Sequence, residues 1–223
     1  MTPRRDRRQL LTLLAIVGCA LGVGLLAVIV NGQGGLAFDA PVATYVAGLP
    51  ISVGVWMLAT HAGGIAIVPV AVVLIVYLLV ARQYRMAMVV VVALVATALA
   101  TDHVKDLIQR PRPSGEPLVS AQGYSFPSGH SIMSAVAYGL VALVIWRSGL
   151  SAGSRRTCVI LLGILVVLVG LSRIALGVHY ASDVLASWLA ATAIVLSVAT
   201  ATRPGRPHTR PASYDASDSA SPD

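Results

Sequence analysis

Residues 10–30 read LLTLLAIVGCALGVGLLAVIV, a run of 21 residues without a charge. A helix needs about 20 predominantly apolar residues to cross a bilayer. Similar runs follow, and we predict a span in each of residues 63–80, 86–107, 130–146, 158–176 and 180–201. With 57% hydrophobic and 11% charged residues among 223, the chain does not resemble a soluble domain with buried core helices. We predict an all-α fold, a polytopic membrane bundle of about six transmembrane helices.

Two segments allow a second interpretation. Residues 10–30 follow four arginines, as in a signal peptide, but the run is longer than the usual apolar core and its small residues lie inside it. We therefore favour an uncleaved span. Residues 31–62 are interrupted by glycines, Pro41 and Pro50. We expect a loop with an interfacial or re-entrant helix there, and a seventh span over residues 41–60 is the alternative.

Basic residues lie next to the apolar runs and predict the orientation. The clusters are Arg4, Arg5, Arg7 and Arg8; Arg82 and Arg85; Arg147, Arg155 and Arg156; and Arg203, Arg206 and Arg210. With six spans they all fall on one side, which the positive-inside rule makes cytoplasmic. We expect residues 1–9 to be a basic cytoplasmic tail, residues 10–201 a six-span domain, and residues 202–223 a disordered cytoplasmic tail. Four remaining cations fall on the outer side, where we expect them to bind an anion: Lys105, Arg110, Arg112 and Arg173.

The net charge of +7 and the pI near 10.0 do not indicate a nucleic-acid-binding protein. The basic residues flank apolar segments, and no basic helix is interleaved with exposed aromatic residues. The expected partners are therefore the bilayer and a substrate within it, with no nucleic acid. The oligomeric state stays open.

The first of three motifs at the outer ends of the predicted spans is KDLIQRPRP, residues 105–113. Lysine supplies a compact positive charge and arginine binds phosphate oxygens with two donors, so Lys105 and Arg112 are candidate phosphate ligands. For Arg110, two other roles are open besides anion binding: anchoring at the lipid headgroups, and pairing with Asp106 at helical spacing.

The second motif is PSGH, residues 127–130, which opens a predicted span. Ser128 is a favoured N-cap residue, and the free N–H groups of a first helical turn attract phosphate. Gly129 allows the backbone to approach a ligand closely. His130 is placed to transfer a proton.

The third motif is Ser172-Arg173, followed by His179 and Asp183. His179 and Asp183 are four residues apart, so on a helix they share a face and the carboxylate can hold one ring nitrogen. The other nitrogen is then free to act as a nucleophile or base. Arg173 adds a further candidate ligand for phosphate.

Together the three motifs resemble those of the type-2 phosphatidic acid phosphatase superfamily, which shares its site with vanadium haloperoxidases. The family pattern is Lys-x6-Arg-Pro, then Pro-Ser-Gly-His, then Ser-Arg-x5-His-x3-Asp, and residues 102–183 keep every spacing. The resemblance implies that His179 attacks phosphorus to form a phosphohistidine, that Asp183 orients it, and that His130 protonates the leaving oxygen. It also implies that no metal or other cofactor is needed and that the phosphate is held by Lys105, Arg112, Ser128, Gly129 and Arg173.

The resulting hypothesis is an integral-membrane lipid phosphatase with its site on the outer side. Candidate substrates are undecaprenyl diphosphate, which we favour, phosphatidylglycerophosphate and phosphatidic acid; the preference for monophosphate or diphosphate stays open. An anion or lipid-headgroup transporter is the alternative from another class, although no internal repeat is evident. A haloperoxidase with vanadate as cofactor is a third, against which six spans argue. No role is assigned to His61, His103, Asp102 or Glu116.

Overall fold

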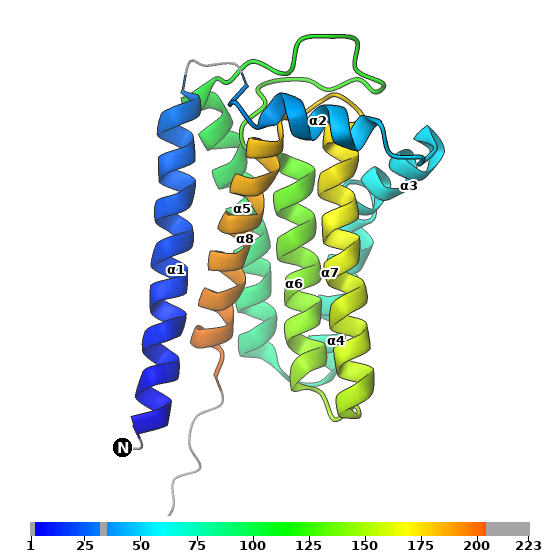
Figure 1. The fold of residues 1–223 in the computed structure, drawn as a ribbon. Helices are drawn as coiled ribbons and strands as arrows, with labels where there is room; N and C mark the ends of the chain where they lie inside the picture. The colour runs from blue at the N-terminus through cyan, green and yellow to red at the C-terminus, as the bar shows by residue number, and fades with distance from the viewer. Residues whose placement is uncertain (1–2, 32–34, 204–223) are drawn as a thin grey trace, which may run out of the picture.

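The structure is a computed structural model that describes residues 3–31 and 35–203 of the chain. The described residues form eight helices and no strand: α1 (Pro3–Val30), α2 (Asp39–Ala47), α3 (Val53–Gly63), α4 (Ile67–Val80), α5 (Tyr84–Ile108), α6 (Gly129–Arg147), α7 (Ala152–Ala175) and α8 (Ala181–Ala201). The predicted all-α fold class is confirmed. The long helices run side by side, and the N-terminus lies at the lower end of the bundle in Figure 1.

Five helices are long and apolar enough to cross a membrane, namely α1, α5, α6, α7 and α8. The pair α3 and α4 forms a sixth crossing if the two are taken together across their bend of 41°. In α1, only 6% of the most apolar part is buried inside the protein, so most of its leucines and valines are exposed on the surface of the bundle. A bilayer removes such a surface from water. The chain is a multi-pass membrane protein.

The second crossing differs from the predicted one. We expected a single helix over residues 63–80, but α4 begins at Ile67 and has 14 residues. At about 1.5 Å per residue it is about 21 Å long, which is less than the hydrocarbon thickness of about 30 Å. The crossing therefore needs α3 as well. The chain bends at Gly64, whose backbone angles leave the helical range (φ −115°, ψ −96°).

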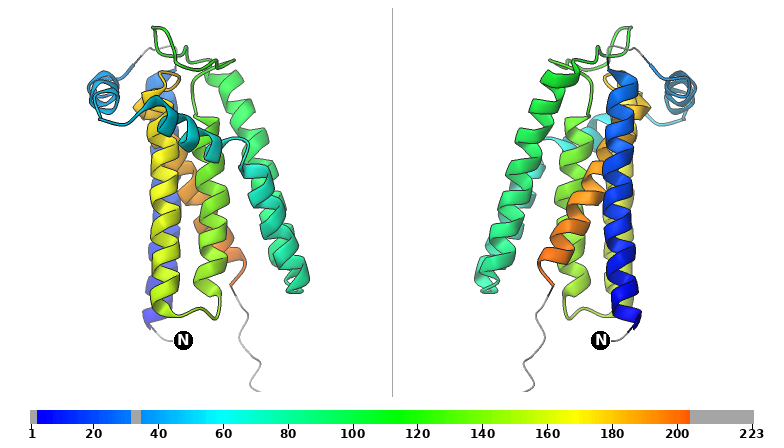
Figure 2. Two further views of the ribbon diagram at one scale, coloured as in Figure 1. Left: turned by 90° about the vertical axis from the view of Figure 1, so that its right-hand side faces the viewer. Right: turned by 90° about the vertical axis from the view of Figure 1, so that its left-hand side faces the viewer.

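In the chain, helix α2 comes between the first crossing, α1, and the second, α3 and α4. It runs crosswise to the long helices near the upper end of the bundle (Figure 1). It has nine residues, which is too short for a seventh span. Two of its side chains, Asp39 and Val46, are buried. They pack where α2 meets α7 and α8. The helix thus lies against α7 and α8, beside the end of the bundle that carries the three motifs (Figure 2).

The basic clusters and the motifs lie at opposite ends of the bundle. The α4–α5 and α6–α7 turns and the end of α8 lie at the lower end, with the start of α1 (Figures 1 and 2). There Arg85 donates to the carbonyl of Ala201 at 2.9 Å and Arg147 to that of Ala199 at 2.8 Å. Most of the predicted C-terminal tail, with Arg206 and Arg210, lies outside the described residues.

Small residues set the spacing of α6, α7 and α8. A Cβ added at Gly170 of α7 would lie 2.4 Å from the Trp188 ring and 2.7 Å from Val184, both on α8. A Cβ added at Gly139 of α6 would lie 2.8 Å from Val195 of α8. Membrane helices approach closely where such small residues lie between them. These contacts fix α8, and with it the motif residues at its upper end.

Candidate active site

The three motifs meet at the upper end of the bundle, close to α2. Lys105 lies in the last turn of α5, Gly129 and His130 begin α6, Arg173 is in the last turn of α7, and Asp183 is in the first turn of α8. Arg112, Ser128 and His179 lie in the connections between these helices. His130 is within electrostatic range of Lys105, Arg112, Arg173 and His179. The structure therefore brings together side chains from all three motifs.

His179 lies between a carboxylate and a guanidinium. Its Nδ1 is 3.4 Å from Asp183 Oδ2, and its Nε2 is 3.4 Å from Arg112 Nη1. Because a guanidinium has donors and no acceptor, the Nε2 that faces it carries the lone pair, and Nδ1 carries the proton. An unprotonated ring nitrogen that faces cations is the arrangement a nucleophile needs for attack on phosphate.

The contact between His179 and Asp183 arises from a helix cap. We predicted that both residues would share a helix face, but His179 precedes α8, which begins at Ala181. Asp183 Oδ2 accepts a hydrogen bond from the N–H of Tyr180 at 2.9 Å and another from the Ser125 hydroxyl at 2.5 Å. The carboxylate thus caps the first turn of α8 and is aimed at His179 by the same geometry.

Arg112 is fixed beside His179 by backbone carbonyls. Its side chain donates to the carbonyls of Gly123 at 3.0 Å, Gln122 at 2.7 Å and Val178 at 2.8 Å. Burial lowers the pKa of Arg112, and the charge of Asp183 opposes this shift. The arginine keeps its charge at neutral pH because guanidinium groups start from a very high pKa.

Arg173 is placed by the first half of the bent crossing. It is buried and donates to the hydroxyl of Thr60 on α3. The charge of Arg112 acts repulsively on Arg173, and both arginines act repulsively on Lys105. A phosphate between the three cations would relieve this repulsion.

A cavity of about 310 Å³ opens beside Lys105, Gly129 and His130. Much of the remaining lining is apolar and comes from Ile67, Val68, Ala98 and Met133. Gly64 lies against the His130 ring, since an added Cβ would be 2.8 Å from its Nε2. Within residues 3–31 and 35–203, no three His, Cys, Asp or Glu side chains are grouped as metal ligands. The site thus joins polar phosphate ligands to an apolar wall.

Ser128 occupies the N-cap position of α6, as predicted, but its hydroxyl does not cap the helix. The hydroxyl accepts from Ser131 at 2.9 Å, and the Ser128 carbonyl accepts from Ser187 of α8 at 3.1 Å. A Cβ added at Gly129 would lie 3.5 Å from Lys105 Nζ. The lysine ammonium therefore passes over the first turn of α6, where we expected phosphate to bind.

The match to a known family decides what kind of site this is. The model of the PAP2 superfamily matches residues 85–206, a range that contains all eight predicted site residues. The chain belongs to the PAP2 superfamily. The resemblance drawn from the three motifs is confirmed.

Individual PAP2 relatives agree with this assignment. The chain is 40% identical over 83 residues to phosphatidylglycerophosphatase B of Bacillus subtilis (strain 168), which is 37% of this chain and 41% of that protein. The aligned part thus covers less than half of the relative. The crystal structure of a transmembrane PAP2-type phosphatidylglycerolphosphate phosphatase from Bacillus subtilis matches with a TM-score of 0.72 and 25% identity, over 82% of this chain and 93% of that one. Aquifex aeolicus LpxE shares the fold, with a TM-score of 0.57 and 18% identity over 73% and 95% of the two chains.

Of two charged residues behind the PAP2 site, sequence reasoning gave Arg110 the wrong role and missed Asp39. Arg110 is fully buried and pairs with Asp39 and Asp183, so our expectations of an anion ligand, of a headgroup anchor and of an Asp106 pair are wrong. The physical reason is that the chain turns at Gln109 (φ 50°), which takes Arg110 off the α5 helix. Asp39 was not singled out. Its signal was available, because it is the only Asp, Glu, Lys or Arg between Arg8 and Arg82.

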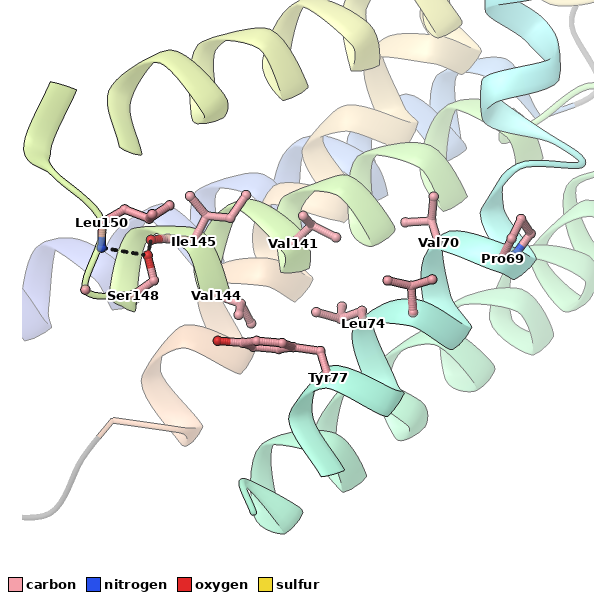
Figure 3. A pocket seen from close by; sticks show the side chains of 11 residues that line it. Pro69, Val70, Leu74, Tyr77, Val141, Val144, Ile145, Ser148 and Leu150 are labelled. Carbon is pink, nitrogen blue, oxygen red and sulfur yellow. Dashed lines mark hydrogen bonds between the residues drawn. The ribbon is translucent and has the colours of Figure 1, made fainter. Parts of the chain in front are cut away.

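A second cavity, of about 740 Å³, lies outside the PAP2 site (Figure 3). It runs between α4 and α6 to the α6–α7 turn and is lined mainly by apolar side chains, including Val70, Leu74, Tyr77, Val141 and Val144. It contains none of the eight predicted site residues. In Figure 2, α4 and α5 diverge from the other helices toward this lower end. We assign the cavity no part in the site.

Proposed function

We propose that this PAP2 protein is a lipid phosphatase that hydrolyses the phosphate ester or diphosphate of a membrane lipid through a phosphohistidine at His179. The observation that carries the proposal is the position of the His179 ring, with Nδ1 facing Asp183 and Nε2 facing Arg112. The apolar wall of the cavity beside Lys105 and His130 supports a lipid as the substrate.

In the proposed first step, the Nε2 lone pair of His179 forms a bond to phosphorus while the bond to the leaving oxygen breaks. His130, in its protonated form, gives a proton to that oxygen and becomes neutral. Lys105, Arg112 and Arg173 stabilise the charge on the other phosphate oxygens. The ring of His179 becomes positive as it bonds to phosphorus, and the Asp183 carboxylate at Nδ1 stabilises that charge.

In the proposed second step, His130 takes a proton from water and the water oxygen attacks the phosphohistidine. The bond between phosphorus and Nε2 breaks, which releases inorganic phosphate for a monoester. His179 returns to the neutral form with its proton on Nδ1. Both steps use the protein's own cations and need no metal ion.

The substrate and the orientation are also proposed. The names of the Bacillus subtilis relatives favour phosphatidylglycerophosphate. The outward orientation that we propose favours undecaprenyl diphosphate, the preferred candidate of our sequence analysis. The basic residues at the lower end, opposite the site, favour cytoplasmic termini and a site on the outer side.

The test is phosphate release by the purified protein in detergent with EDTA, with undecaprenyl diphosphate, phosphatidylglycerophosphate and phosphatidic acid as substrates. We expect release in EDTA, with the rank of kcat/KM naming the substrate, and release by intact cells from an impermeant short-chain substrate. Binding of all three lipids without any release would contradict the proposal and favour the transporter. Release that depends on cell lysis would contradict the outer orientation.

The protonation of His179 leads to a prediction on pH. Burial lowers the pKa of His179 from its ordinary value of 6.5 to about 4, and the hydrogen bond with Asp183 opposes the shift only in part. We expect the ring to stay neutral, and the nucleophile available, from neutral pH down to about pH 4. Because the folded pKa lies below the unfolded one, the contribution of His179 to stability is complete above about pH 6.5 and is lost as pH falls through about 4.

NMR of protein labelled with ¹³C at histidine measures this titration. The His179 signal is assigned as the one that disappears in His179→Ala, and its midpoint is expected near pH 4. A midpoint near 6.5 would show that the ring is not buried as described, and would contradict a nucleophile that stays neutral down to about pH 4.

A further inference from the structure

A buried chain of charges links helix α2 to the proposed nucleophile. Arg110 lies between two carboxylates: Nη2 is 3.0 Å from Asp39 Oδ2, and Nη1 is 2.5 Å from Asp183 Oδ1. The exposed fractions of Asp39, Arg110 and Asp183 are 2%, 0% and 0%. A charge this deep is stable only when it is paired and hydrogen-bonded. The three residues therefore act as one unit.

Asp39 fixes both Arg110 and the start of α8. Its Oδ1 accepts from the N–H of Ser182 at 2.7 Å, and its Oδ2 accepts from the Ser182 hydroxyl at 2.8 Å and from the N–H of Leu36 at 2.7 Å. Arg110 also donates to the Ser182 hydroxyl at 2.8 Å. Its guanidinium lies over the Tyr180 ring, 4.0 Å from the centroid. Every one of these contacts restricts how Arg110 can approach Asp183.

Arg110 and His179 contact different oxygens of the same carboxylate. Arg110 binds Oδ1 of Asp183, which leaves Oδ2 for Ser125, Tyr180 and His179. Without a cation beside it, a buried carboxylate binds a proton, and a protonated Asp183 no longer holds the Nδ1 proton of His179. Arg110 thus keeps Asp183 ionised and aimed.

The charge of Asp39 also acts through Arg110. One cation between two carboxylates leaves one net negative charge behind His179. With Asp39 neutral, Arg110 would cancel the charge of Asp183, and the positive ring of the phosphohistidine step would lose its counter-charge.

We propose that Asp39 and Arg110 are positioning residues of the phosphatase reaction: Asp39 on α2 holds Arg110, and Arg110 holds the Asp183 carboxylate against His179. The proposal rests on the proposed function. It makes α2, a helix that carries none of the three motifs, part of the apparatus that orients the nucleophile.

The test is a double-mutant cycle with Arg110→Gln, Asp39→Asn and the double variant, assayed by lipid phosphate release. We expect kcat to fall about 100-fold in Arg110→Gln and about tenfold in Asp39→Asn, with KM within about twofold of wild type, because neither residue is placed to touch the phosphate. Since Asp39 acts through Arg110, the double variant is expected to have at least the kcat of Arg110→Gln.

Arg110→Lys keeps the cation and is expected to recover part of the loss. Glu116→Gln removes an exposed carboxylate at the same end of the molecule and is the matched control, with kcat expected unchanged.

The outcomes separate this proposal from the proposed function. Wild-type protein without phosphatase activity would contradict the function. If the wild type is active but kcat is unchanged in the variants, the positioning role is overturned and the proposed function stands. The same holds if the losses of the two single variants add up in the double variant. The folded state is checked by thermal unfolding in detergent. If all the variants, Arg110→Lys included, fail to fold, the network serves stability and the proposal is overturned.

Discussion

Replacement of His179 by alanine is expected to abolish lipid phosphate release, with kcat lower by at least about 10⁴-fold. The proposed reaction forms its covalent bond at Nε2 of this ring, and Lys105, Arg112 and Arg173 have no lone pair to substitute for it. The binding residues remain, so the variant should still bind the substrate. The measurement is phosphate release together with trapping of an acid-labile phosphoenzyme, which should form in wild type and be absent from the variant.

His103→Ala is the matched control for this experiment. His103 lies on α5, two residues before Lys105, and its side chain is exposed. The same change of side chain there is expected to leave kcat unaltered. A His179→Ala variant that keeps activity within about tenfold of wild type would show that the reaction does not use His179 as its nucleophile.

Asp183→Asn is expected to lower kcat by about 10³-fold and to reduce stability as well. An asparagine presents one oxygen and one amide nitrogen, whereas both oxygens of Asp183 accept hydrogen bonds, from Arg110 on one side and from Ser125 and Tyr180 on the other. Whichever way the amide points, donors face donors, and the Nδ1 proton of His179 loses its ionised acceptor. Breaking such a buried pair costs about 3–5 kcal/mol. The measurements are kcat and the thermal unfolding temperature in detergent.

Glu116→Gln again supplies the control, because Glu116 is an exposed carboxylate at the same end. It is expected to change neither quantity. If Asp183→Asn unfolds at the wild-type temperature and retains its kcat, Asp183 neither orients His179 nor balances Arg110.

The sequence predicted which residues the structure brings together at the candidate site, because their chemistry restricts where they can lie. Lys105, His130 and Arg173 were selected as candidates from their motifs, since each is a polar residue at the end of an apolar run. The spacing of His179 and Asp183 was recognised correctly, but its cause was not. A separation of four residues fits two residues on one face of a helix. It also fits a residue just before a helix together with a capping residue in its first turn. The sequence alone does not distinguish these two arrangements.

The parts that sequence reasoning missed depend on contacts between distant segments. Asp39 stood out only as an isolated charge, and its partner Arg110 lies 71 residues further along. The bend at Gly64 was missed because residues 51–80 hold no charged residue to mark a boundary. Glycine is required there because His130 lies close to Gly64 and Val169 lies close to Gly63. These contacts arise from tertiary packing, which the sequence does not reveal.

The long-range bonds of Asp39 and Thr60 have a consequence for how the protein is made. Ser182, which binds Asp39, follows it by 143 residues, and Arg173, which binds Thr60, follows that threonine by 113. During synthesis from the N-terminus, α2 and α3 therefore leave the ribosome well before their partners exist. Asp39 must stay in contact with water until Arg110, 71 residues further along, has been synthesised, because a lone carboxylate is too costly to bury. Helix α8, the last of the described helices, supplies Ser182 and Asp183, so the hydrogen bonds of this network are complete only after it has been synthesised.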